Sequence, residues 1–140
     1  MYKIKCKKLI KEIRNFPLKE KIKAINFIRS EIHKISPFKN EPVDCITWIE
    51  HEKVIANDYN PNTVAPPEMK LLELSIYEDG YTQPIVTWNT GENYEVVDGF
   101  HRTRVAKENQ EIKKRINGYL PIVIANQNRV DRGDRIAATI

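Results

Sequence analysis

Residues 94–107 place a strand, a tight turn and a helix in immediate succession. An apolar, β-branched run ends at Asp98, and a helical pattern containing Val105 and Ala106 follows at once. Gly99 stands where the backbone must turn. A helix entered in this way directs its first unpaired N–H groups, and the positive end of its dipole, toward the preceding loop. The sequence therefore predicts a phosphate-binding position at the start of this helix.

The first turn of the helix adds cationic side chains to that position. His101, Arg102 and Arg104 supply donors suited to phosphate oxygens, because arginine offers a planar fork and histidine can donate in either charge state. The same cations on an isolated helix also fit a solvated surface. For Asp98, which precedes the turn, we expect a helix-capping role, with orientation of His101 or of a metal-bound water as the alternative.

Length and composition bound the class of protein. The chain has 140 residues, of which 41% are hydrophobic and 30% charged, so we expect one compact core with an appendage. No apolar run reaches the roughly 18 residues of a membrane helix, and the amino terminus lacks the apolar region of a secretory signal. We therefore expect a cytoplasmic protein without a membrane partner. Cys6 and Cys45 lack metal-ligand spacing, and we assign no metal-binding residues.

The positive charge is concentrated in the N-terminal arm. Residues 1–34 contain 11 Lys and Arg against 3 Glu, a net charge of +8, whereas the remaining 106 residues carry −4. Such an arm fits DNA or an acidic partner surface, although a solvated helix face presents the same pattern. DNA contact through the arm is therefore one of the interpretations that the sequence leaves open.

Residues 1–35 are predicted to form a basic amphipathic helical hairpin. Apolar residues recur at helical spacing in 1–16 and again in 18–35, and Pro17 interrupts between them. A hairpin of this size rarely buries enough surface to be stable alone, so its apolar faces must pack on each other, on the main domain or on a second copy in a homodimer. Residues 36–42 form a linker, because two prolines within it prevent a continuing helix.

The remaining chain, residues 43–140, alternates strand and helix patterns and predicts an α+β domain. We expect strands at 43–49, 81–88, 94–97 and 119–125, with a hairpin turn at 89–92. Pro66 and Pro67 suit the first turn of a helix that continues through 68–79. The other expected segments are a short irregular or single-turn element at 50–57, an Asn- and Pro-rich loop at 58–67, a charged connector at 111–118 and an amphipathic helix at 130–140.

Three segments, in order, resemble the ParB N-terminal domain and sulfiredoxin superfamily. Residues 59–62, Tyr-Asn-Pro-Asn, are similar to its Asn-Pro loop; residues 72–86 resemble its first box, with a Ser-Ile pair, a glycine and Gln-Pro-Ile. Residues 98–102, Asp-Gly-Phe-His-Arg, resemble its second box. The resemblance covers residues 43–140 and implies a small mixed sheet with packed helices that binds a nucleotide. Residues 36–45 and 60–69 further resemble a subgroup of ParB-like regulators paired with a PAPS-reductase-like protein.

The resemblance implies that ATP, CTP or ADP, with Mg²⁺, is held by its phosphates at the start of the His-Arg helix, and that Ser75 faces the same pocket. Without the resemblance, Ser75 is explained as a helix-surface or packing residue, and Gln83 as a strand-edge amide. The candidate nucleotide-binding residues are Asn60, Ser75, Gln83, Asp98, Gly99, Phe100, His101, Arg102 and Arg104. The candidate catalytic residues are Glu50, Glu52, Asp58 and His101.

Two departures from the family pattern limit the chemistry. Phe100 stands where sulfiredoxin has its catalytic cysteine, which excludes sulfinic-acid reduction at this position, and Asn62 stands where ParB has a loop arginine. The first functional interpretation is a Mg²⁺-dependent nucleotide hydrolase or phosphotransferase, in which a carboxylate from 50–58 directs water or a hydroxyl. The alternative is a non-catalytic transcriptional co-regulator whose contact with DNA or protein depends on bound nucleotide.

Overall fold

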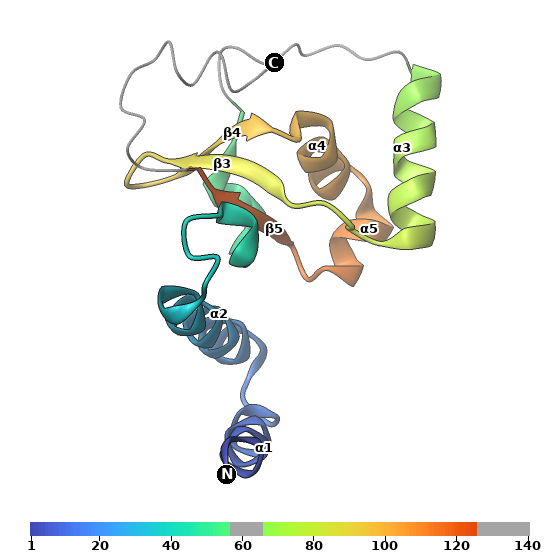
Figure 1. The fold of residues 1–140 in the computed structure, drawn as a ribbon. Coiled ribbons are helices and arrows are strands. Elements are labelled where there is room, and N and C mark those ends of the chain that lie inside the picture. Colours follow the sequence, from blue (N-terminus) through green and yellow to red (C-terminus); the bar gives the residue numbers. More distant parts are fainter. Residues whose placement is uncertain (57–65, 126–140) are drawn as a thin grey trace. The chain divides into compact units, whose positions relative to one another are not determined.

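The computed structural model describes residues 1–56 and 66–125 (Figure 1). The chain separates into two compact units, Met1–Lys39 and Asn40–Ile140. The expectations for the loop at 58–65 and for a helix at 130–140 fall outside the described residues. Within the described ranges, no helix is long and apolar enough to span a bilayer.

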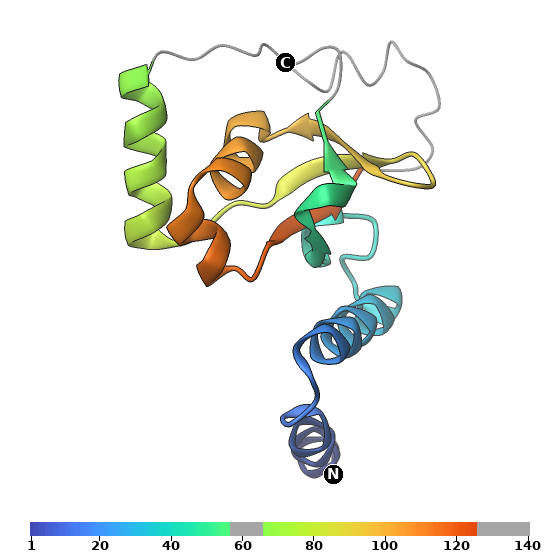
Figure 2. The ribbon, with the colours of Figure 1, turned by 180° about the vertical axis from the view of Figure 1, so that it is seen from behind.

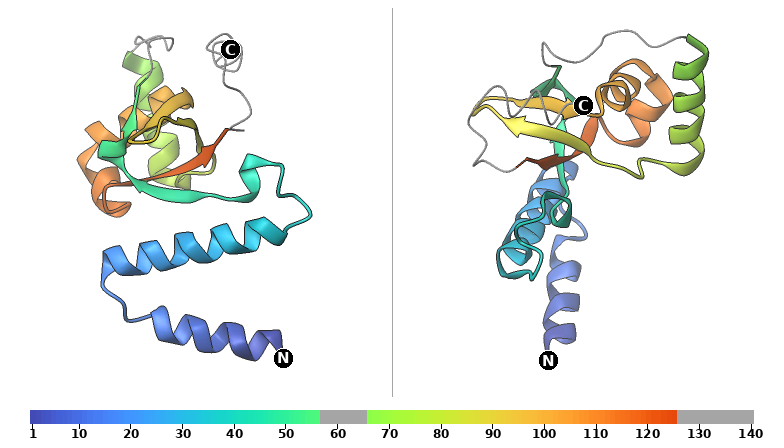
Figure 3. Two further views of the ribbon diagram at one scale, coloured as in Figure 1. Left: turned by 90° about the vertical axis from the view of Figure 1, so that its left-hand side faces the viewer. Right: turned by 45° about the horizontal axis from the view of Figure 1, so that its top comes forward.

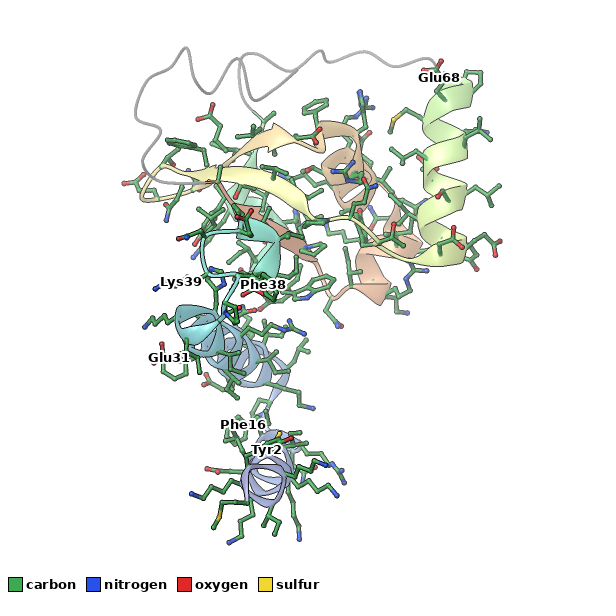
Figure 4. The ribbon with its side chains drawn as sticks, viewed as in Figure 1. Tyr2, Phe16, Glu31, Phe38, Lys39 and Glu68 are labelled. Carbon is green, nitrogen blue, oxygen red and sulfur yellow. The ribbon has the colours of Figure 1, made fainter. Side chains whose placement is uncertain are left out.

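The first unit contains α1 (Tyr2–Ile13) and α2 (Leu18–Ile35), which confirms the two predicted helices. Pro17 precedes α2, and the chain reverses direction between the helices (Figure 3). Neither helix contains a buried residue. Tyr2 and Phe16, labelled in Figure 4, are among the exposed large apolar side chains. Within the first unit, the apolar face of α1 is therefore largely uncovered.

The second unit is built around a curled five-stranded mixed sheet in the order β1-β5-β3-β4-β2 (Figure 3). Its strands are β1 (Thr47–Glu50), β2 (Val54–Ile55), β3 (Ile85–Asn89), β4 (Tyr94–Asp98) and β5 (Tyr119–Ile124). β3 pairs antiparallel with β4 across the predicted hairpin, and β1 pairs antiparallel with β5. β3 runs parallel to β5, and β2 runs parallel to β4. The α+β class with a mixed sheet is confirmed.

Three helices pack beside this sheet: α3 (Pro66–Asp79), α4 (Phe100–Glu108) and α5 (Gln110–Arg115). α4 and α5 lie between α3 and the strands (Figure 2). Consecutive residues of α4 pack into two different hydrophobic clusters. Ala106 packs with sheet residues such as Ile85 and Ile122, whereas Val105 packs with Ile76 of α3 and Ile112 of α5. The start of α4 is thereby fixed against both layers.

The amino-terminal part of this sheet differs from the prediction. β1 begins at Thr47 rather than at 43, because residues 42–44 form the short 3₁₀ helix η1 (Pro42–Asp44). The stretch 50–57, expected to be irregular or a single helical turn, contains the single-turn 3₁₀ helix η2 (His51–Lys53) and also strand β2, which was not predicted. A strand of two residues is too short to leave a periodic pattern in the sequence.

The predicted connector at 111–118 was wrong, since α5 occupies most of it. The side chain of Asn109 caps this helix by accepting a hydrogen bond from the Ile112 N–H at 3.0 Å. Ile112 is fully buried, and a helix of six residues shows no repeating apolar pattern. β3 also begins later than expected, at Ile85, because Pro84 has no N–H to donate to a sheet.

Candidate functional site

The turn between β4 and α4 has the geometry that the sequence predicted. Gly99 is the N-cap residue and adopts the left-handed conformation, with φ 101° and ψ 27°. The expected capping role of Asp98 is wrong, because Gly99 holds the N-cap position and no side-chain cap hydrogen bond is formed among the described residues. The Thr103 N–H and hydroxyl both donate to the Gly99 carbonyl at 2.9 Å. As at other helix starts, the N–H groups before Thr103 have no partner within the helix.

Glycine is required at position 99 for a second reason, which is the close approach of Arg102. A Cβ atom at this position would lie 2.8 Å from Arg102 Nη2 and 3.1 Å from Cδ1 of Ile85. Any larger residue would therefore strain the backbone and also displace the guanidinium group.

Arg102 is held in place by neutral groups. Its Nη2 donates to the Pro84 carbonyl at 3.1 Å, and its own carbonyl accepts from the Tyr81 hydroxyl at 2.7 Å. Its Nε is buried without a hydrogen-bond partner, and Arg102 forms no salt bridge within the described part of the chain. Burial raises the pKa of Tyr81 well above its usual range, so this phenol stays protonated and able to donate. Sequence reasoning missed Tyr81, since no local pattern links it to Arg102.

Arg102 borders an open cavity of about 620 Å³. Of the predicted site residues, the structure brings Gln83, Asp98 and Arg102 together there. The remaining lining residues, which the sequence did not assign to the site, are Glu41, Pro42, Val43, Pro84, Val86, Val123 and Ala125. The wall therefore combines η1 and the residue before it, residues of the three strands β3, β4 and β5, the segment that leads into β3, and the first turn of α4. Its two carboxylates, on Glu41 and Asp98, face solvent.

Phe100 and His101 lie beside this cavity rather than in its lining. Phe100 packs against the sheet core, and its ring meets that of His101 edge-on, with centroids 5.4 Å apart. The Nδ1 atom of His101 is buried and has no hydrogen-bond partner in the part of the chain that the structure describes. The structure thus leaves two unsatisfied side-chain nitrogens, this one and Arg102 Nε, in the first turn of one helix. Such groups are rare in folded proteins and call for an explanation.

Two further candidates lie elsewhere. Ser75 is exposed on α3 and does not line the cavity. Arg104 Nε donates to the Glu108 carboxylate at 2.7 Å, one turn further along α4. That hydrogen bond raises the pKa of Arg104 and lowers the pKa of Glu108. The charge of Arg104 is therefore already balanced by a carboxylate, unlike that of Arg102.

The structure does not bring the candidate carboxylates to the cavity. Glu50 pairs with Tyr119 at the end of β1, and Glu52 in η2 lies 3.2 Å from His51 Nε2. Neither belongs to the cavity lining. Lys107 lies near this group and donates to the Val54 carbonyl at 2.7 Å. Asp58 and Asn60 fall outside the described residues.

The described residues hold no group of three or more His, Cys, Asp or Glu that could bind a metal ion. Magnesium differs from zinc in this respect, because it keeps several waters and uses one or two carboxylates together with substrate phosphates. Asp98, the last residue of β4, supplies one such carboxylate and lines the same cavity as Arg102. The residues present therefore fit a phosphate-bound Mg²⁺ rather than a metal site built from protein alone.

Comparison with known families identifies the class to which this fold and site belong. The family model described as the ParB N-terminal domain matches residues 35–132. The chain is therefore a member of the ParB N-terminal domain family, which confirms the resemblance seen in the sequence.

Three individual proteins are also similar to this chain. The Escherichia coli (strain K12) protein YbdM, described as uncharacterized, is 51% identical over 127 residues, which are 90% of this chain and 59% of YbdM. The chain thus spans less than two thirds of that relative. Caulobacter crescentus ParB complexed with CTP-γ-S has a TM-score of 0.54 at 24% identity, covering 68% of this chain and 50% of that one. C-terminally truncated SbnI from Staphylococcus aureus has a TM-score of 0.47 at 19% identity, covering 64% and 34%.

Proposed function

We propose that this protein binds a nucleotide through its phosphates at the amino end of α4, with the rest of the ligand in the adjoining cavity. The observation that carries the proposal is the state of Arg102. Its guanidinium group is oriented by a neutral carbonyl, borders the cavity and has no carboxylate partner among the described residues. A cation that is oriented and unpaired in this way, at the amino end of a helix, favours the binding of a polyanion.

The cavity supports a ligand of nucleotide size. Ligand sites in proteins have volumes of roughly 300–1,000 Å³, and this one has about 620 Å³. Gln83 offers an amide to the sugar or base, and Asp98 can hold a Mg²⁺ ion that neutralises the phosphates. A carboxylate beside the phosphates without such an ion would oppose binding, so we expect binding to depend on Mg²⁺.

CTP is the first nucleotide to test, because the related ParB structure contains CTP-γ-S. ATP and ADP follow, since the phosphate-binding part of the site does not read the base. Selectivity among the three would come from other lining residues, such as Gln83 and Glu41.

Between the two functional interpretations, the described geometry favours a nucleotide-regulated binding module over an enzyme. Hydrolysis needs a base within hydrogen-bond reach of the attacking water. Glu50 and Glu52 lie outside the cavity lining, which leaves Asp98 and Glu41 as its described carboxylates. Hydrolysis or phosphoryl transfer is the second candidate function, and it is favoured by the Asp98 carboxylate next to Arg102.

Isothermal titration calorimetry with CTP, ATP and ADP, each with and without Mg²⁺, tests the proposal. Arg102→Ala should weaken binding by about 10- to 100-fold, the effect of losing a charge-assisted hydrogen bond of about 1.5–3 kcal/mol. Lys114→Ala removes an exposed cation from α5 and should leave the affinity unchanged. Equal affinity of the wild type and Arg102→Ala would rule out this site. Release of phosphate from bound nucleotide over hours would favour the enzyme, and intact nucleotide the regulated module.

Two macromolecular partners remain proposals for this chain. The basic arm, residues 1–34, is proposed to contact DNA, and deletion of the arm should then remove the salt dependence of binding to a short duplex. A PAPS-reductase-like protein is proposed as a partner from the subgroup resemblance. Co-purification of the two proteins, with and without nucleotide, is the direct test.

A further inference from the structure

The apolar stripe of α1 has no cover within the first unit. Tyr2, Cys6, Leu9 and Ile13 follow one another at intervals of four, three and four residues, which places them on one face of the helix. Tyr2 is 76% exposed and Leu9 39% exposed, and no residue of α1 is buried. A continuous apolar stripe bordered by lysines marks an interaction surface.

We propose that this stripe binds the same stripe of a second copy of the chain, with the two α1 helices antiparallel. In that arrangement Tyr2 lies opposite Ile13 of the second copy, and Cys6 lies opposite Leu9. A twofold axis passes near the middle of each helix, so one surface serves both copies and the assembly closes as a dimer.

The charges that flank the stripe select the antiparallel direction. Glu12 is the one acidic residue of α1, and it lies on the same side of the stripe as Lys5, seven residues earlier. Antiparallel pairing brings Lys5 of each copy to Glu12 of the other, so the symmetry forms two ion pairs. Parallel pairing would bring Lys5 to the apolar Ile10 instead. The remaining lysines, such as Lys11, lie on the outer side and stay solvated.

Other occupants explain less of the surface. A nucleic acid would use the lysines and leave Tyr2 and Leu9 exposed. A second copy covers both side chains and pairs the single acid of the helix as well. Because α1 has only 12 residues, we expect a weak dimer whose population depends on concentration.

Light scattering on the full chain over a range of concentrations tests this proposal. The mass should rise toward twice 16.4 kDa. Glu12→Lys replaces two attractions with two repulsions and should weaken association by roughly tenfold. Adding Lys5→Glu to Glu12→Lys reverses both charges and should restore the wild-type dimer. Lys11→Glu makes the same charge change on the outer side and should not weaken association.

A second pair of variants separates the stripe from general hydrophobicity. Leu9→Ser should abolish the dimer, whereas Ile4→Ser, which removes an apolar residue 65% exposed on the opposite side of α1, should not. Circular dichroism confirms that each variant keeps its helices. A wild-type chain that stays monomeric up to about 1 mM, the weak end of specific association, overturns the proposal. A dimer that survives both Leu9→Ser and Glu12→Lys overturns it as well.

Discussion

α1 and α4 are both basic helices, but the cations of α1 are exposed, whereas tertiary contacts hold Arg102 of α4 in place. In α1 every residue except Ile13 is exposed, and the lysines face solvent. In α4, Arg102 is fixed by Pro84 and Tyr81 and is half-buried beside a cavity. A cationic side chain becomes a specific hydrogen-bond donor to an anion when neighbouring groups hold it before the ligand arrives. Less conformational entropy is then lost on binding. Net charge alone would indicate the N-terminal arm as the anion-binding region, whereas the orientation of Arg102 indicates α4.

The largest difference between the two regions should appear in folding stability. Ile112→Ala empties a fully buried position between α3, α4 and α5, and should lower the free energy of unfolding by about 2–5 kcal/mol. Ile10→Ala makes the same chemical change in α1, where the side chain is 49% exposed, and should change it by less than about 0.5 kcal/mol. Urea denaturation at low protein concentration measures both. Equal losses would mean that α1 is packed in solution as tightly as the second unit.

A smaller difference in stability is expected between substitutions at two glycines that share one backbone conformation. Gly99 and Gly91 have φ of 101° and 100°, but only the Cβ added at Gly99 meets other atoms, at 2.8 Å from Arg102 Nη2. Gly91→Ala should therefore cost about 1–2 kcal/mol for the left-handed backbone alone. Gly99→Ala should cost more than that and should also weaken nucleotide binding. If the two losses are equal, Arg102 moves aside freely and is not held as the structure shows.

The smallest expected effect concerns pH and His51, which lies outside the proposed site. Burial lowers the pKa of His51 below its usual value, and the nearby Glu52 carboxylate opposes that shift. The unfolded chain therefore takes up a proton first as the pH falls through about 6.5. Stability should be at its full value above that pH and decline below it. His51→Gln should flatten this part of the pH profile in thermal unfolding, and an unchanged slope would assign the decline to other groups.

The sequence predicted the elements whose signals are local. Asp98-Gly99 marked the start of α4 to the residue, because a glycine before a cationic helix can be read without knowing the fold. The resemblance to ParB was likewise confirmed by the family match over residues 35–132. Local signals also led to one error, since Asp98 has the right chemistry for a cap but Gly99 takes that position.

The parts that could not be predicted depend on residues distant in the sequence. Arg102 is positioned by Tyr81 and Pro84, about 20 residues earlier, and Glu41 reaches the cavity because its neighbouring 3₁₀ helix contacts β5. Nothing in the sequence near Glu41 indicates either contact. The separation of Glu52 from the cavity has the same origin, because η2 contacts β2 and α4 and contributes no residue to the cavity lining.

The bond from Lys107 to the Val54 carbonyl has a consequence for the behaviour of the protein at high concentration. β2 forms one border of the sheet and offers just two residues, one of whose carbonyl groups already accepts from that lysine. Open borders of sheets can recruit strands from other molecules and seed aggregates, and short borders guarded by lysine resist this. This side of the molecule is thereby protected against fibril-like growth.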